Sequence, residues 1–208
     1  MLLLAAYEPR IAAREVCTLD HGSIAALSRV MIEAAILAFY ISDTALTPEQ
    51  WELRKNVLWL NDATTRHRMF TGLGGSQAPG EGREAIAMLR GRVEASAEFQ
   101  SLEDERKRKI LSGSEVYLHG LRAAVRGLGW QVEEFNGMYA YLSAHSHSSP
   151  VSFIRMDEHG VDYRNPTRAQ KSIAGISLEW SWKNLKAVTD RLEEVFRDPA
   201  VNVQPEAT

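Results

Sequence analysis

The segment from Ser23 to Ser42 constrains the fold most strongly, because it carries only two charged residues, Arg29 and Glu33. Its other residues are almost all apolar or small, and it closes with the run AAILAFYI. A helix that is apolar on all sides is normally enclosed by other helices. We therefore predict a central, buried helix over residues 23–42 with a bundle of helices around it.

Helical periodicity recurs along most of the chain and predicts an all-α, multi-helix bundle of about seven helices. The clearest helix start is Thr47-Pro48-Glu49-Gln50, which places an N-cap, a proline and a capping-box glutamine in order. Gly113 and Gly129 are expected to end helices. The expected helical ranges are 9–19, 23–42, 48–70, 83–100, 102–111, 115–128, 130–145 and 167–197.

Three stretches depart from this helical pattern. Residues 72–82 are a loop by composition. Residues 151–164 predict a short extended insertion, a hairpin of VSFIRM and VDYR around the turn DEHG. Residues 198–208 contain two prolines and no core pattern, which is typical of a disordered tail. The length of 208 residues fits one domain, so we expect a single helical-bundle domain over residues 1–197.

Charge and cysteine content exclude several classes of protein. The net charge is −3, from 24 basic and 27 acidic residues, which disfavours nucleic-acid binding by bulk charge but allows a local basic site. The one cysteine, Cys17, rules out an internal disulfide framework. The opening MLLLAAYEPR lacks the positive region of a secretory signal, and the longest apolar run elsewhere is far shorter than a membrane span. We expect a cytoplasmic protein that does not enter a membrane.

The pair Arg29 and Glu33 is the first candidate for a functional site. The two residues are four apart and share one helix face. Among such apolar neighbours we expect both to be buried, and buried charges are nearly always paired. Loss of Glu33 would then leave Arg29 unpaired, at a cost of about 3–5 kcal/mol. The pair either ties helices together or lines a polar pocket, and the sequence leaves both readings open.

The second candidate is NGMYAYLSAHSHSSP, residues 136–150. Tyr139, Ser143 and His147 follow at four-residue intervals on one helical stripe, and His145 lies on the neighbouring stripe. Histidines at a helix end beside a hydroxyl suit phosphate binding or acid–base chemistry. They equally suit capping of the last helical carbonyls. The predicted hairpin would bring Arg155 near this helix end, where its guanidinium could bind a phosphate or carboxylate.

Together, R-x3-E at Arg29 and Glu33 and Y-x3-S-x3-H at Tyr139, Ser143 and His147 resemble a bacterial all-helical family of unknown function. The resemblance covers roughly residues 20–150. That family is similar to the HEPN domains, many of which are metal-independent ribonucleases of defence and toxin systems. The resemblance implies a bundle in which the two motifs lie close together, with Arg29 and His147 as the candidate catalytic residues.

One departure separates this chain from catalytic HEPN domains, in which a histidine follows an arginine after four to six residues. The single such spacing here, Arg14 to His21, lies on the first predicted helix rather than late in the chain. We therefore expect a non-catalytic bundle that binds a partner or an anionic ligand through a pocket. The residues assigned to this pocket are Arg29, Glu33, Tyr139, Ser143, His145, His147 and Arg155. A metal-independent endoribonuclease acting on RNA is the alternative.

Metal and cofactor sites have little support in the sequence. His145, His147 and Glu33 have the ligand types of a two-histidine, one-carboxylate site. However, no Glu-x-x-His of the helical di-iron pattern occurs in the chain. The glycine-rich loop after Gly72 lacks the lysine and the strand of a phosphate-binding P-loop. We expect no metal and no cofactor.

The predicted last helix, 167–197, is longer than a bundle of this size requires. Its expected core-facing residues are Ile173, Ile176, Trp180, Leu185, Val188, Leu192 and Val195. Apolar surface in excess of what the chain can cover is a liability unless a partner covers it. We therefore expect a homodimer, or a complex with another protein, through part of residues 168–197.

Overall fold

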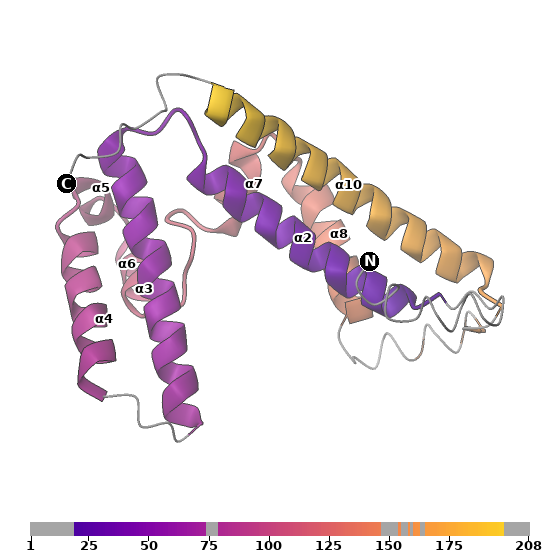
Figure 1. The fold of residues 1–208 in the computed structure, drawn as a ribbon, viewed down its shortest axis with the longest axis horizontal. Coiled ribbons are helices and arrows are strands. Elements are labelled where there is room, and N and C mark those ends of the chain that lie inside the picture. Colours follow the sequence, from indigo (N-terminus) through magenta and orange to yellow (C-terminus); the bar gives the residue numbers. More distant parts are fainter. Residues whose placement is uncertain are drawn as a thin grey trace. The chain divides into compact units, whose positions relative to one another are not determined.

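The computed structural model describes residues 19–73, 79–146, 154, 158, 160–162 and 165–197. Their secondary structure is helical, with no strand among them (Figure 1), which confirms the all-α prediction. The helices of this part of the chain are α2 (His21–Ile41), α3 (Pro48–Gly72), α4 (Pro79–Glu94), α5 (Ala97–Gln100), α6 (Asp104–Leu111), α7 (Leu121–Gly127), α8 (Val132–Ser146) and α10 (Arg168–Arg197).

The helix signals that rest on local chemistry are confirmed. Thr47 caps α3 with a capping box: its hydroxyl accepts the Gln50 N–H at 3.3 Å, and the Gln50 side chain accepts the Thr47 N–H at 3.1 Å. Gly113 and Gly129 follow α6 and α7 with φ of 68° and 73°. These left-handed conformations are ones that glycine adopts without a steric penalty.

Other boundaries differ from the prediction. The stretch 83–100 is two helices, because the Ser96 side chain caps a new helix, α5, by accepting the Phe99 N–H. Ser101 ends α5, and the helix predicted from residue 102 begins only after Glu103, as α6. The helix predicted from residue 115 starts only at Leu121. The predicted helix 9–19 and the tail 198–208 lie outside the described residues, apart from Leu19.

The predicted hairpin over 151–164 is wrong where the structure can test it. Ile154 and Glu158 are helical rather than extended, and residues 160–162 form no strand. The start of α10 is ordered instead by Gln170, whose side-chain oxygen accepts the N–H groups of Asp162 and Thr167 at 3.1 and 2.9 Å. Arg155 lies outside the described residues.

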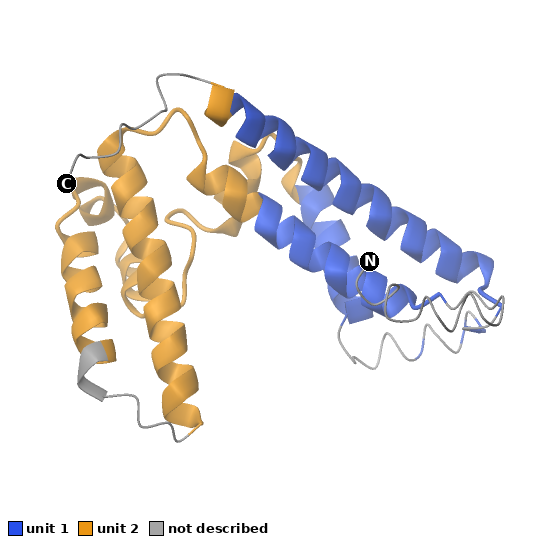
Figure 2. Ribbon diagram, in the orientation of Figure 1, with its two compact units in different colours: residues 1–35, 133–194 blue, residues 36–132, 195–208 orange. Residues whose placement is uncertain are grey.

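The helices divide into two compact units (Figure 2). Unit 1 comprises residues 1–35 and 133–194, with most of α2, all of α8 except its first residue, Val132, and most of α10. Unit 2 comprises residues 36–132 and 195–208, with α3 to α7 and the last turn of α2. A single domain over residues 1–197 remains a prediction.

Unit 2 has an apolar core built mainly from the helices α3 to α6. Leu53, Val57 and Leu60 follow one face of α3 and are buried, as the i, i+4, i+7 spacing of an amphipathic helix requires. Phe99 of the short helix α5 is 1% exposed in the same cluster. The other buried members of this cluster are Tyr40, Ile86, Leu89, Val93, Ile110 and Leu118.

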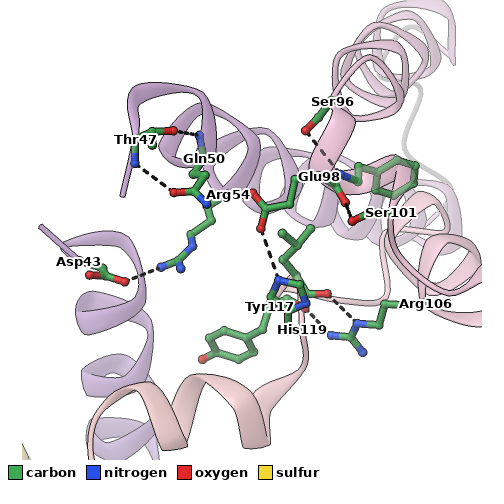
Figure 3. Close-up of polar contacts among 12 residues, drawn as sticks. Asp43, Thr47, Gln50, Arg54, Ser96, Glu98, Ser101, Arg106, Tyr117 and His119 are labelled. Atoms are coloured by element: carbon green, nitrogen blue, oxygen red, sulfur yellow. Dashed lines mark hydrogen bonds and ion pairs between the residues drawn. The ribbon is translucent and has the colours of Figure 1, made fainter. Parts of the chain in front are cut away.

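The connection from α6 to α7 is held by side chains that bond to its backbone (Figure 3). Arg106 Nε donates to the Leu118 carbonyl at 2.8 Å, and the same guanidinium donates to the Tyr117 carbonyl and pairs with Glu115 at 3.1 Å. The buried Leu118 N–H donates to the Tyr40 hydroxyl at 3.0 Å. These three backbone groups of the turn are thereby satisfied without a helix or a strand.

Unit 1 is built differently, because its helices bury small and polar side chains. The inner face of α10 contains Ile173 and Ala174, followed by Ser177, Ser181 and Asn184. These three polar side chains bond to carbonyls one turn earlier on α10, at 2.8, 2.9 and 2.6 Å. The two serine hydroxyls are therefore satisfied within the helix and can be buried, whereas the buried Asn184 Oδ1 accepts no hydrogen bond among the described residues.

The predicted faces of α2 and α10 need correction. The buried residues of α2 form one stripe, with His21, Ala25, Ser28, Ile32 and Ala35 among them, and Leu27, Val30 and Met31 are exposed. The helix is therefore not enclosed on all sides. On α10, serines replace the expected apolar stripe on the inner face, and three of the residues expected there are exposed: Ile176, Leu185 and Leu192.

Within the described residues, α2 alone is long and apolar enough to span a membrane by length and composition. Its most apolar window has a mean hydropathy of 1.9, and 33% of that window is buried. Core helices of soluble proteins and signal sequences meet the same criterion, so the finding assigns no location by itself.

Candidate functional site

Helices α2 and α8 bring Arg29, Glu33 and Tyr139 together in unit 1. Arg29 Nε donates to Glu33 Oε1 at 3.1 Å, and Arg29 Nη2 donates to the Tyr139 hydroxyl at 2.8 Å. That hydroxyl in turn donates to Glu33 Oε1 at 2.6 Å. The guanidinium carbon also lies 4.8 Å from the centroid of the Tyr139 ring. The predicted contact between the two sequence motifs is confirmed for these three residues, which we call the triad.

The triad is less buried than the sequence suggested. The side chain of Arg29 is 23% exposed and that of Glu33 is 44% exposed. The expectation that both are mostly buried is therefore wrong for Glu33. The reason is that α2 is covered along one stripe only, and Glu33 lies beside this stripe rather than on it.

The protonation states of the triad follow from these contacts. Burial raises the pKa of Tyr139, and its hydrogen bond to Glu33 raises that pKa further. Burial alone would lower the pKa of Arg29, but its bonds to Tyr139 and Glu33 outweigh burial and raise it. At neutral pH the tyrosine is therefore a protonated donor, the arginine is a cation, and both donate to one carboxylate oxygen.

The substitution Glu33→Ala tests how much the triad contributes to stability. A half-exposed ion pair with one added hydrogen bond contributes little, so we expect a loss of about 0.5–1.5 kcal/mol in the free energy of unfolding. This replaces the 3–5 kcal/mol that full burial would imply. Denaturant unfolding of the variant and the wild type measures the difference. A loss above 3 kcal/mol would show that Arg29 is more enclosed than its exposure indicates.

The serines of α8 act locally. Ser143 Oγ donates to the Tyr139 carbonyl at 2.6 Å, and Ser146 Oγ donates to the Ser143 carbonyl at 3.2 Å. The Ser146 bond is the predicted capping of a carbonyl at the helix end, whereas the Ser143 bond joins a carbonyl within the helix, one turn earlier. The Ser143 hydroxyl is thus engaged with its own helix rather than with the triad.

The structure places His145 in a second, aromatic group. Its ring centroid lies 6.0 Å from that of His21 and 4.7 Å from that of Tyr141. His145 is six residues beyond Tyr139 on α8, which corresponds to about 9 Å along the helix axis. His147 and Arg155, the other predicted site residues, lie outside the described residues.

Sequence reasoning missed His21 as a member of this group. His21 is the first residue of α2 and is 1% exposed. Burial lowers the pKa of its imidazole, and the neighbouring carboxylate of Asp20 opposes the shift only in part. The available signal was a histidine directly ahead of a strongly apolar helix, but a single histidine in that position is not specific.

The lowered pKa of His21 predicts acid sensitivity. The unfolded chain protonates this histidine near pH 6.5, whereas the folded chain does so only at lower pH. The unfolded state therefore binds more protons below pH 6.5, and stability is lost as the pH falls through that region. We expect the melting temperature to fall between pH 7.5 and 5.5 by less in His21→Gln than in the wild type. Equal falls would contradict a neutral, buried His21.

Unit 2 contains a cleft of about 680 Å³ that sequence reasoning did not identify. It lies between the start of α3 and the α4–α5 junction, and its charged lining residues are Glu49, Glu52, Glu98 and Arg92. Three acidic residues against one basic residue make it a poor site for an anion. Among the described residues, no group of three histidine, cysteine, aspartate or glutamate side chains is placed to hold a metal ion.

Comparison of the chain with protein-family models, with curated proteins and with solved structures gave no significant match. The interpretation of the site therefore depends on its geometry.

Proposed function

We propose that the protein is a binding module that takes an anionic group, a phosphate or a carboxylate, at the triad in exchange for the Glu33 carboxylate. The observation that carries the proposal is the convergence of two donors, Arg29 Nε–H and the Tyr139 hydroxyl, on the single oxygen Glu33 Oε1. Arginine and tyrosine are donors that bind phosphate and carboxylate oxygens.

The exposure of Glu33 supports the exchange. With 44% of its side chain exposed, Glu33 can rotate into water while α2 remains in place. Arg29 and Tyr139 are held more firmly, because the guanidinium contacts both the hydroxyl and the ring of Tyr139. The Glu33 carboxylate would thus compete with an anionic ligand for the same two donors. A ligand must displace this carboxylate, which lowers the affinity of the wild type for the ligand.

The hydrogen bonding of the Ser143 hydroxyl and the protonation of the Tyr139 hydroxyl favour a binding role over catalysis. RNA cleavage needs an acid–base group at the phosphate. Within the described part of α8, the Ser143 hydroxyl donates to a helix carbonyl and the Tyr139 hydroxyl stays protonated. The Glu33 Oε1 atom of the triad already accepts hydrogen bonds from two donors.

The same contacts support a role for α2 as a bundle helix rather than as a membrane span. Its two charged residues bond to each other, and through Tyr139 they bond to α8. We accordingly propose a soluble protein of the cytoplasm.

Titration with inorganic phosphate tests the proposal. Glu33→Gln removes the competing charge and should bind phosphate roughly tenfold more tightly than the wild type, since a charged hydrogen bond contributes about 1.5–3 kcal/mol before screening. Arg29→Met in the Glu33→Gln background should abolish the gain. Glu52→Gln, which breaks an exposed ion pair with Lys55 in unit 2, is the matched control and should leave affinity unchanged.

Two results would overturn this assignment. Equal phosphate affinity in Glu33→Gln and the wild type would remove the triad as an anion site. Cleavage of mixed RNA by the wild type in the presence of chelator, lost in His147→Ala, would replace the binding module with a metal-independent ribonuclease.

A further inference from the structure

The cleft of unit 2 has two walls that come from different helices. Its volume of about 680 Å³ lies within the range of about 300–1,000 Å³ that small-molecule sites occupy. On one wall, Glu49, Glu52, Leu53 and Asn56 follow one face of α3 from its first turn. The lining residues of the other wall, at the α4–α5 junction, are Arg92, Ala95, Ser96, Ala97 and Glu98.

Burial separates the floor of this cleft from its rim. Leu53 and Asn56 are buried, whereas Glu49, Glu52 and Arg92 are exposed. A ligand would therefore place its innermost group beside one apolar side chain and one amide, with charged side chains around the opening.

Two oxygen atoms in the lining are shielded from water and have no donor among the described residues. Asn56 is 7% exposed, and its Oδ1 accepts no hydrogen bond from them. Glu98 Oε2 is likewise without such a donor, while Glu98 Oε1 lies 3.4 Å from His119 Nε2 (Figure 3). Shielded acceptors in folded proteins are normally hydrogen-bonded. A ligand that brings donors to these two oxygens would satisfy both.

The charges of the lining favour a cation. Its three glutamates outnumber its one arginine, Arg92, which forms no ion pair within the described part of the chain. Glu52 pairs with Lys55 of its own helix, and Glu98 contacts His119, which is charged only when protonated. The cleft therefore has an excess of negative charge, which attracts positively charged ligands.

The chemistry of the lining favours an organic cation over a metal ion. No three histidine, cysteine, aspartate or glutamate side chains of the described residues are placed to share a metal. An ammonium group has three N–H donors and no acceptor, so it matches oxygens that lack a donor. The apolar lining residues suit methylene groups, and they are Pro48, Leu53, Ala95 and Ala97.

We propose that this cleft binds an aliphatic polyamine. One ammonium group donates to Asn56 Oδ1 at the floor, and another binds the carboxylate of Glu98 on the opposite wall. The methylene segments between them lie against Leu53 and the alanines of the α4–α5 junction. A lysine-rich peptide carries the same ammonium groups, and titration with each ligand distinguishes the two. The inference concerns unit 2 and is independent of the proposed anion site.

Isothermal titration calorimetry of the full chain with spermidine tests the proposal. We expect one spermidine per chain, bound more weakly as salt screens the charges. Asn56→Leu and Glu98→Gln should each weaken binding about tenfold, because each removes an acceptor for a charged donor. Asn56→Leu breaks no hydrogen bond to a described residue, so its thermal melt should show a folded protein. Glu98→Gln is interpretable by itself if Asn56→Leu does not fold.

Glu105→Gln is the matched control for Glu98→Gln. Glu105 is an exposed glutamate of α6 that pairs with Lys109 and does not line the cleft. Its loss should leave the affinity for spermidine unchanged. A monoamine, n-butylamine, should bind roughly tenfold more weakly than spermidine, because one ammonium group cannot reach acceptors on both walls.

Three results would overturn the proposal. The first is a wild type that does not bind spermidine. The second is an equal loss of affinity in Glu98→Gln and Glu105→Gln, which would show that spermidine binds to surface charge in general. The third is tighter binding of trilysine than of spermidine, which would assign the cleft to a peptide.

Discussion

Replacing Gly113 with alanine should lower the free energy of unfolding by roughly 2–5 kcal/mol. Its φ of 68° is a conformation that costs other residues about 1–2 kcal/mol. An added Cβ would also lie 2.5 Å from Thr64 Oγ1 and 2.6 Å from Thr64 Cβ. Relief of that clash moves α3 away from the α6–α7 connection, and overpacking of this kind costs about 1–3 kcal/mol.

Gly129→Ala is the matched control for Gly113→Ala. Its φ of 73° is nearly the same, but nothing lies within 4 Å of an added Cβ. The loss should therefore be limited to the backbone cost of about 1–2 kcal/mol. Denaturant unfolding of both variants separates the two contributions. Equal losses would contradict the close approach of Gly113 to Thr64.

Arg106→Met should lower the free energy of unfolding by about 2–4 kcal/mol. The methionine keeps most of the apolar stem but leaves the carbonyls of Tyr117 and Leu118 without their charged donor (Figure 3). Loss of the partner of a shielded polar group costs about 1–3 kcal/mol. Glu115 loses its ion pair with Arg106 as well.

Arg66→Met is the matched control for Arg106→Met. Arg66 also pairs with a carboxylate, Asp62, but both side chains are more than half exposed. An exposed pair contributes at most about 1 kcal/mol, so the thermal melt should change little. If the two variants lose equal stability, Arg106 does not hold the connection between α6 and α7.

Local signals in the sequence predicted the helices, but not which faces they bury. The capping box at Thr47 and the helix ends at Gly113 and Gly129 depend on a few neighbouring residues, so their chemistry can be read directly. The burial of Ser177 and Ser181 on α10 depends on back-bonding to their own helix and on the helices packed against it. Side-chain polarity alone therefore assigned the wrong face.

The sequence predicted which residues form the triad, but not how far their side chains are buried. The four-residue spacing of Arg29 and Glu33 requires that they share one face of a helix. The family resemblance implied that Tyr139 lies near them, and the structure shows Tyr139 bonded to both. Exposure of Glu33 depends on how many helices cover α2, which no local pattern encodes. His21 was missed for the same reason, since its burial arises from contacts with residues distant in sequence, such as His145.

The Arg29 Nε–H resonance, followed by NMR during titration with inorganic phosphate, tests the central claim most directly. This N–H donates to Glu33 in the free protein, so displacement of the carboxylate must change its environment. We predict that the resonance of the wild type shifts with phosphate until the shift saturates. In Glu33→Gln the shift should saturate at a phosphate concentration roughly tenfold lower, because the competing carboxylate is absent. An Arg29 resonance that does not respond to phosphate in either protein would contradict anion binding at the triad.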